Sequence, residues 1–178
     1  FSITHINLTH RNWTAIGWPD CAELPIVDPR GLLTPFLDGW SLDAWIMPQQ
    51  GEYLLPSRAV QSQQELRMAG DISIRTETVL HGMALVTQAS VELEDGIAVC
   101  KLRLRAKADQ QGYLVLALRP QNPEGISFIH RVRLNSERTA WQVDDNKRVE
   151  FSRKAERHHV STYRQGDVYI HLNDTREQ

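Results

Sequence analysis

The amino-acid sequence predicts an all-β protein, a large antiparallel two-sheet sandwich with an irregular N-terminal third rich in proline and tryptophan. Two observations carry this prediction. Apolar side chains recur at every second position through most of the chain after residue 70, which is the period of a half-buried strand. Turn-forming residues interrupt these runs about every ten residues, as in antiparallel sandwiches. A chain of 178 residues is expected to form one domain, here residues 1–178.

The first third of the chain differs because prolines and tryptophans are crowded there. Proline fixes the backbone φ angle and has no N–H for a ladder, so strands in this part should be short. The one helix candidate is 57–69, with Ser57 as a suitable N-cap, but its apolar residues form a poor stripe. We therefore expect this segment to be irregular or to hold one short helix. The prolines and tryptophans are Pro19, Pro25, Pro29, Pro35, Pro48 and Pro56, and Trp13, Trp18, Trp40 and Trp45.

The clearest strands follow residue 70. Segment 71–78 alternates, and 83–93 lines one face of a long strand with apolar residues. After a turn at 94–96, the segment 100–107 alternates apolar and cationic residues, which predicts one buried face and one solvated face. The cationic row consists of Lys101, Arg103, Arg105 and Lys107.

The remaining strands are predicted from the same alternation. Segment 113–118 is apolar on both faces, so we expect a central strand covered on both sides. Segment 119–125 must break that strand because it holds two prolines. Further strands are expected in 126–134, in a hairpin formed by 140–143 and 148–151, and in a last pair formed by 159–163 and 168–172.

Charge and hydropathy exclude several classes of partner. The chain has 20 Lys+Arg and 22 Asp+Glu, a net charge of −2, so it lacks the cationic surplus of a nucleic-acid-binding protein. No apolar run approaches the roughly 18 residues of a membrane span, and no secretory signal is evident, so we expect a cytoplasmic location. The chain starts directly in an apolar alternation at Phe1 and stops soon after 168–172. We therefore expect it to be an N-terminal part excised from a longer polypeptide.

No catalytic residue, metal site or cofactor is expected from the residues. His158 and His159 are adjacent, so on a strand they would point to opposite faces and could not share a metal ion. Cys21 and Cys100 are too few for a disulfide framework or a zinc site, and Cys100 is expected to pack as a small buried hydrophobe. Phosphate-cradle and nucleophile-elbow motifs are absent from the sequence.

The tryptophans of the N-terminal third have two interpretations. Exposed indole rings stack on sugar faces, and Asp38 and Asp43 flank Trp40 in a way that resembles carboxylate-and-aromatic sugar sites. Large indoles also anchor an irregular segment onto a sandwich, and Asp38-Gly39 is an ordinary turn former. The sequence leaves both interpretations open.

Two stretches resemble a known family. They are VDPRGLLTP (27–35) with DGWSLDAW (38–45), and LALRPQNPEGIS (116–127). They resemble the N-terminal β-sandwich, a galactose-mutarotase-like supersandwich, of bacterial proteins related to glycogen-debranching and glucoamylase-type glycoside hydrolases. In that family an (α/α)6 toroid outside the sandwich holds the catalytic carboxylates.

The resemblance implies a non-catalytic accessory domain of an enzyme that acts on α-glucans. Its partner would be the catalytic domain of the same polypeptide, with an oligosaccharide as a further candidate ligand. The residues expected to contact sugar or the neighbouring domain are Trp40, Asp43, Trp45, Arg119 and Asn122. The alternatives are a self-sufficient carbohydrate-binding module and an aldose-epimerase-like enzyme, although no spacing marks the His–Glu pair that such an enzyme needs.

Overall fold

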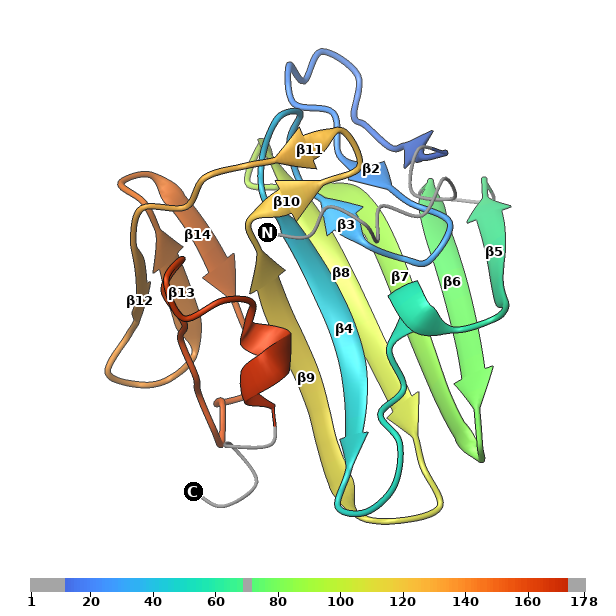
Figure 1. Cartoon of the computed structure of the whole chain (residues 1–178). Coiled ribbons are helices and arrows are strands. Elements are labelled where there is room, and N and C mark those ends of the chain that lie inside the picture. The colour runs from blue at the N-terminus through green and yellow to red at the C-terminus, as the bar shows by residue number, and fades with distance from the viewer. Residues whose placement is uncertain (1–11, 69–71, 173–178) are drawn as a thin grey trace. The chain divides into compact units, whose positions relative to one another are not determined.

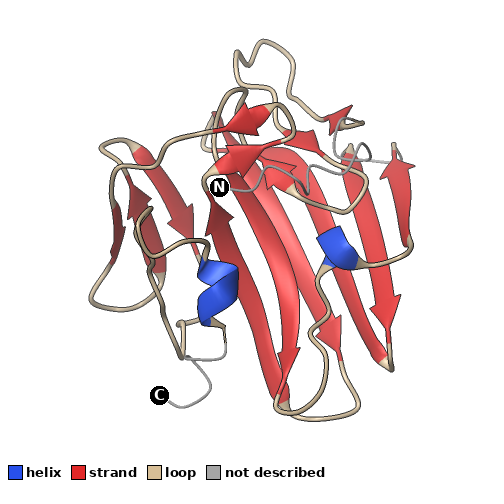
Figure 2. Cartoon of the chain, in the orientation of Figure 1, coloured by secondary structure: helices blue, strands red, loops and turns tan. Residues whose placement is uncertain are grey.

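The computed structural model describes residues 12–68 and 72–172. Regular structure in these ranges is antiparallel β-sheet with short 3₁₀ turns, which confirms the predicted all-β class (Figures 1 and 2). Within these ranges no helix is long and apolar enough to cross a membrane. The chain separates into two compact units, residues 1–127 and 128–178, and each is described by itself.

The first sheet of the N-terminal unit has the strand order β1-β2-β3-β4-β9. Its strands are β1 (Thr14–Ala15), β2 (Ile26–Val27), β3 (Leu33–Thr34), β4 (Ser41–Pro48) and β9 (Gly112–Arg119). The first three strands have two residues each, as the crowded prolines predict. By contrast, β4 has eight residues, all of them buried, and forms the centre of this unit.

The second sheet has the order β5-β6-β7-β8. Its strands are β5 (Ser62–Arg67), β6 (Ser73–Leu80), β7 (Met83–Glu94) and β8 (Ile97–Lys107). The alternation seen in the sequence sets the register here, because each apolar row must face the core. A small hairpin of β10 (Gln121–Asn122) and β11 (Gly125–Ile126) completes the unit.

The core of the N-terminal unit joins the two sheets. Its central cluster consists of Ala44, Ile46, Leu54, Met83 and Leu85. Thr76, Thr78 and Thr87 on the same inner face of the second sheet are also buried. The turn between β2 and β3 lies against them, since a Cβ on Gly31, whose φ is +87°, would come within 2.6 Å of the Thr87 hydroxyl. Gly31 is therefore required both for its backbone conformation and for its close approach.

The C-terminal unit holds one three-stranded sheet. Its strands are β12 (Val132–Leu134), β13 (Ala140–Val143) and β14 (Lys147–Glu150). The β13–β14 pair confirms the predicted hairpin. Trp141 packs edge-to-face on Phe151, with ring centroids 4.8 Å apart, and supplies an aromatic contact for this small sheet.

The segment 57–69 corrects one expectation. It holds a 3₁₀ turn at Pro56–Arg58 and then β5, which pairs with β6 from Ser62↔Thr78 to Arg67↔Ser73. The residues of β5, Ser-Gln-Gln-Glu-Leu-Arg, include several good helix formers, but ladder bonds to β6 outweigh that weak local preference.

Two further expectations are wrong. The apolar strand at 113–118 is not central, because β9 lies at the edge of its sheet and pairs only with β4 among the described strands; Leu114 is 45% exposed. The last predicted hairpin is absent as well. Val168–His171 is a 3₁₀ turn, begun by Asp167, whose side chain accepts a hydrogen bond from the Tyr169 N–H, and 159–163 contains no strand.

Candidate functional site

The two stretches that carry the family resemblance lie side by side. β4 pairs with β9 along eight positions, from Ser41↔Arg119 to Pro48↔Gly112. Two side chains extend the connection beyond the strands: Ser41 Oγ donates to the carbonyl of Gln121 at 2.6 Å, and Asn122 Nδ2 donates to the carbonyl of Gly39 at 2.8 Å. Segments about 80 residues apart thus form one hydrogen-bonded corner. The motif cluster consists of its predicted site residues, Trp40, Asp43, Trp45, Arg119 and Asn122.

Asp43, Trp45 and Arg119 meet on one face of the first sheet. Ala44 and Ile46 point to the core, so by alternation Asp43 and Trp45 lie on the opposite face of β4. Arg119 Nη1 lies 3.6 Å from Asp43 Oδ2, and its guanidinium carbon lies 5.2 Å from the centroid of the Trp45 ring. All three residues are buried, with at most 9% of any residue exposed. The cation is therefore held between a carboxylate and an indole.

Burial shifts the proton affinity of Asp43. It raises the pKa of the carboxyl from 3.8 to about 6, against the opposing effects of the Arg119 guanidinium and the Trp45 indole. The negative charge of Asp28, which is itself fully buried, adds to the rise. Asp28 is held by its own turn, because its Oδ1 accepts from the backbone N–H of Arg30 and of Leu32. Asp43 thus titrates near neutrality inside a sheet, not in an open cleft.

The other two members of the motif cluster have local structural contacts. Trp40 is 5% exposed and packs edge-to-face on Phe36, with ring centroids 5.1 Å apart. Asn122 Oδ1 accepts from the N–H groups of Glu124 and Gly125 and closes the turn between β10 and β11.

The buried rings of Trp40 and Trp45 offer no open face to a sugar in this conformation. Trp13, by comparison, is 41% exposed. Contact of the motif cluster with a sugar or a neighbouring domain stays a prediction.

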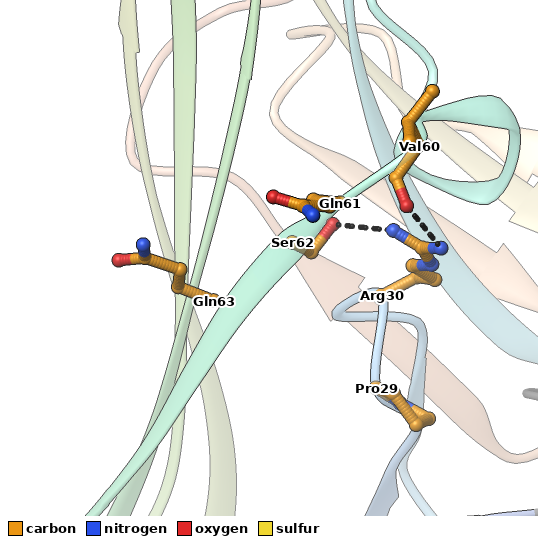
Figure 3. A pocket seen from close by; sticks show the side chains of 6 residues that line it. All are labelled: Pro29, Arg30, Val60, Gln61, Ser62 and Gln63. Atoms are coloured by element: carbon orange, nitrogen blue, oxygen red, sulfur yellow. Dashed lines mark hydrogen bonds between the residues drawn. The ribbon is translucent and has the colours of Figure 1, made fainter.

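A shallow hollow of about 280 Å³ lies elsewhere, between the β2–β3 turn and the start of β5 (Figure 3). Arg30 is one of its lining residues and is already hydrogen-bonded: Nη1 donates to Ser62 Oγ at 3.3 Å and Nη2 to the carbonyl of Val60 at 3.2 Å. The residues that line the hollow are Pro29, Arg30, Val60, Gln61, Ser62 and Gln63. None of them belongs to the motif cluster, although Pro29 and Arg30 lie in the family-like stretch 27–35.

The cationic row on β8 divides into two halves. Lys101 Nζ lies 2.8 Å from Glu92 and 2.6 Å from Glu94, and Arg103 Nη2 lies 2.7 Å from Glu92. These hydrogen bonds lower the pKa of Glu92 to about 2. Arg105 and Lys107 are exposed and make no ion pair within the described part of the chain. The row is thus a solvated face, as predicted, with an ion-pair network at one end only.

The histidine and cysteine side chains of the described ranges do not gather into a metal-binding group. Burial raises the pKa of the Cys100 thiol to about 12, which keeps it protonated and unreactive. Burial and the charge of Arg138 lower the pKa of His158. The rings of His159 and His171 contact each other, with centroids 5.1 Å apart. Among residues 12–68 and 72–172, no group of three or more His, Cys, Asp or Glu side chains could hold a metal ion.

Comparison with family models, with curated proteins and with solved structures finds no match to this chain.

Proposed function

We propose that this chain is a non-catalytic accessory domain of a carbohydrate-active enzyme that acts on α-glucans, and that it packs on the catalytic domain of the same polypeptide. One observation supports this function above the alternatives. The polar and aromatic residues of the two family-like stretches contact one another and the backbone, so they hold two distant segments together.

The contacts of Asp43 illustrate why a structural role fits best. A general acid must reach the glycosidic oxygen, and the pair of carboxyl groups in glycosidases lies roughly 5–10 Å apart across an open cleft. Asp43 is 6% exposed, and the residues around it are Arg119 and Trp45. Its carboxyl lies beside the Arg119 guanidinium and helps to hold it in place. Since Arg119 is the last residue of β9, this contact also holds the end of that strand.

The burial of Trp40 and Trp45 favours this function over that of a carbohydrate-binding module. A binding platform needs aromatic faces in water, with polar groups beside them that hydrogen-bond to hydroxyls. The two indoles of the motif cluster are buried instead, and the amide of Asn122 is occupied by Gly39, Glu124 and Gly125. The resemblance suggests the substrate class, and the contacts of these side chains within the chain support a structural role for them.

The proposed function is tested first on the 178-residue chain. Maltoheptaose and glycogen are titrated while tryptophan fluorescence and released reducing ends are followed, with Trp13→Ala and Trp40→Ala as matched variants. We expect no hydrolysis above buffer and no saturable quenching. Saturable quenching lost in Trp13→Ala would instead identify a binding module, and enzyme-like hydrolysis would identify a catalytic domain.

A second test uses the reading frame beyond Gln178. The proposal expects it to encode a catalytic domain, and expects the longer polypeptide to hydrolyse α-glucans. Asp43→Asn in that polypeptide should leave kcat within about twofold, because the carboxyl does not touch substrate. A drop of a hundredfold or more in kcat, with the fold intact by circular dichroism, overturns the proposal, and so does a frame that ends at Gln178.

A further inference from the structure

The strand β8 forms a long open edge of the second sheet. It pairs with β7 along eleven positions, from Glu94↔Ile97 to Ala84↔Lys107, and it lies at the end of the strand order β5-β6-β7-β8 (Figure 1). Among the described residues no strand pairs with its other side. An edge of this length presents a row of backbone N–H and C=O groups that can accept a further strand.

The two faces of β8 favour different side chains in a strand that would pair with its open edge. On the outer face, Arg105 and Lys107 are exposed and lack an ion-pair partner within the described part of the chain. On the inner face Leu102 and Leu104 are only half-buried, and Leu104 packs on the core cluster. A neighbouring strand with acidic residues on one face and apolar residues on the other would cover both rows.

The strand β7, on the opposite side of β8, already has this pattern. Its end reads Val91-Glu92-Leu93-Glu94, with the glutamates on the outer face. There Glu92 binds Lys101 and Arg103, and Glu94 binds Lys101. Side chains of opposite charge on adjacent strands stabilise a sheet, so β7 shows the chemistry that the far half of the cationic row lacks.

The charge of β8 argues against a second copy of the same strand. In an antiparallel β8–β8 pair that keeps the apolar rows inside, cations would lie opposite cations, and like charges directly opposite destabilise a sheet. The described strands β12, β13 and β14 lack the acidic alternation as well.

We propose that the β8 edge binds an extended segment of a partner protein in which Asp or Glu alternates with Val, Ile or Leu, and that this segment adds a fifth strand to the second sheet. Main-chain hydrogen bonds provide affinity, while Arg105 and Lys107 select acidic side chains. This inference does not depend on the proposed function.

The test uses two synthetic peptides and the intact chain. One peptide is acetyl-Thr-Glu-Val-Glu-Ile-Glu-Val-Thr-amide, and the other carries Lys in place of each Glu. We expect the wild-type chain to bind the Glu peptide about tenfold more tightly than the Lys peptide at low salt, and added NaCl to weaken that preference. Amide hydrogen exchange across 97–107 should slow when the Glu peptide binds.

Charge-exchanged variants make the test specific. Arg105→Glu/Lys107→Glu should reverse the preference and favour the Lys peptide, whereas Arg131→Glu/Arg133→Glu, matched exposed cations of the C-terminal unit, should keep it. Arg105→Gln/Lys107→Gln, a milder change, should abolish the preference if the reversed variant does not fold. The proposal is overturned by equal binding of both peptides, by a preference unchanged in Arg105→Gln/Lys107→Gln, or by a homodimer in which the β8 amides are protected.

Discussion

Asp43 and Glu92 are two carboxylates of the same unit, each beside an arginine, and they respond to their surroundings in opposite ways. Asp43 is buried with Arg119 at 3.6 Å, and burial raises its pKa to about 6. Glu92 lies on the outer face of the second sheet with Lys101 and Arg103 at 2.8 and 2.7 Å, and its pKa falls to about 2. The direction of the pKa shift depends on which effect is larger, the loss of hydration on burial or the attraction of the charged partner.

The comparison explains why the two acids differ in their effect on stability. Removing one partner of a buried pair leaves an uncompensated charge, which is costly, whereas an exposed pair contributes little. Residues of the motif cluster should therefore be sensitive to substitution, and those of the β8 network tolerant.

The largest effect is expected from Arg119→Met. It leaves the Asp43 carboxylate buried without its cation, so we expect the free energy of unfolding at pH 8 to fall by about 3 kcal/mol. The loss should shrink at pH 5, because Asp43 then takes up a proton. Urea denaturation followed by tryptophan fluorescence measures both values. Arg148→Met, which removes an exposed pair with Glu150, is the control and should change stability by less than about 0.5 kcal/mol.

The second prediction concerns pH. Because the folded-state pKa of Asp43 is above its ordinary value, the folded protein binds more protons than the unfolded chain between pH 4 and 6. The contribution of Asp43 to the free energy of unfolding should therefore rise by about 2–3 kcal/mol as the pH falls from 8 to 4, and this gain should be lost as the pH rises through 6. Asp43→Asn should remove this part of the pH dependence, so the difference between the wild-type and variant curves measures it. A wild-type curve parallel to that of Asp43→Asn contradicts the assignment.

A third prediction addresses the corner between the two stretches. Asn122→Ala removes one hydrogen bond to Gly39 and leaves the N–H groups of Glu124 and Gly125 without their side-chain acceptor. We expect a loss of about 1–2 kcal/mol, measured by the same denaturation. Asn146→Ala in the exposed β13–β14 turn is the matched control and should have almost no effect. Equal losses in both variants would show that Asn122 does not brace the corner.

The smallest effect is expected from Glu92→Gln. The pair with Lys101 and Arg103 is partly exposed, so its loss should cost less than about 1 kcal/mol at pH 7 and less again in 1 M NaCl. Since the folded pKa of Glu92 is lowered, its contribution is present above pH 4.5 and disappears as the pH falls towards 2. A salt-independent loss of several kcal/mol would mean that the network is buried.

The second sheet could be predicted from the sequence because apolar side chains recur at every second position along its long strands. The alternation along β6, β7 and β8 is a local pattern, and in the structure β7 pairs with β6 along eight positions and with β8 along eleven. The strand β5 could not be predicted from segment 57–69, where we expected an irregular segment or one short helix. Local helix preference is weak, and the pairing of β5 with β6 that outweighs it is a tertiary contact.

The centre of the first sheet could not be predicted in the same way. The apolar run of β9 suggested a covered strand, yet the fully buried strand is β4, which contains Ser41 and Asp43. Those polar residues are tolerated inside because partners about 80 residues away, Arg119 and the Gln121 carbonyl, satisfy them. The sequence singled out Asp43 through its place beside Trp40 and through the resemblance, and Arg119 through the resemblance, but their contact with each other is visible only in the fold.

The central claim is that the motif cluster joins two distant segments, and a double-mutant cycle on Asp43 and Arg119 tests it most directly. The free energies of unfolding of the wild type, Asp43→Asn, Arg119→Met and the double variant are compared at pH 8. We expect a coupling energy above about 1 kcal/mol, with Asp43→Asn rescuing part of the loss caused by Arg119→Met. Additive losses, with a coupling energy near zero, would contradict the claim.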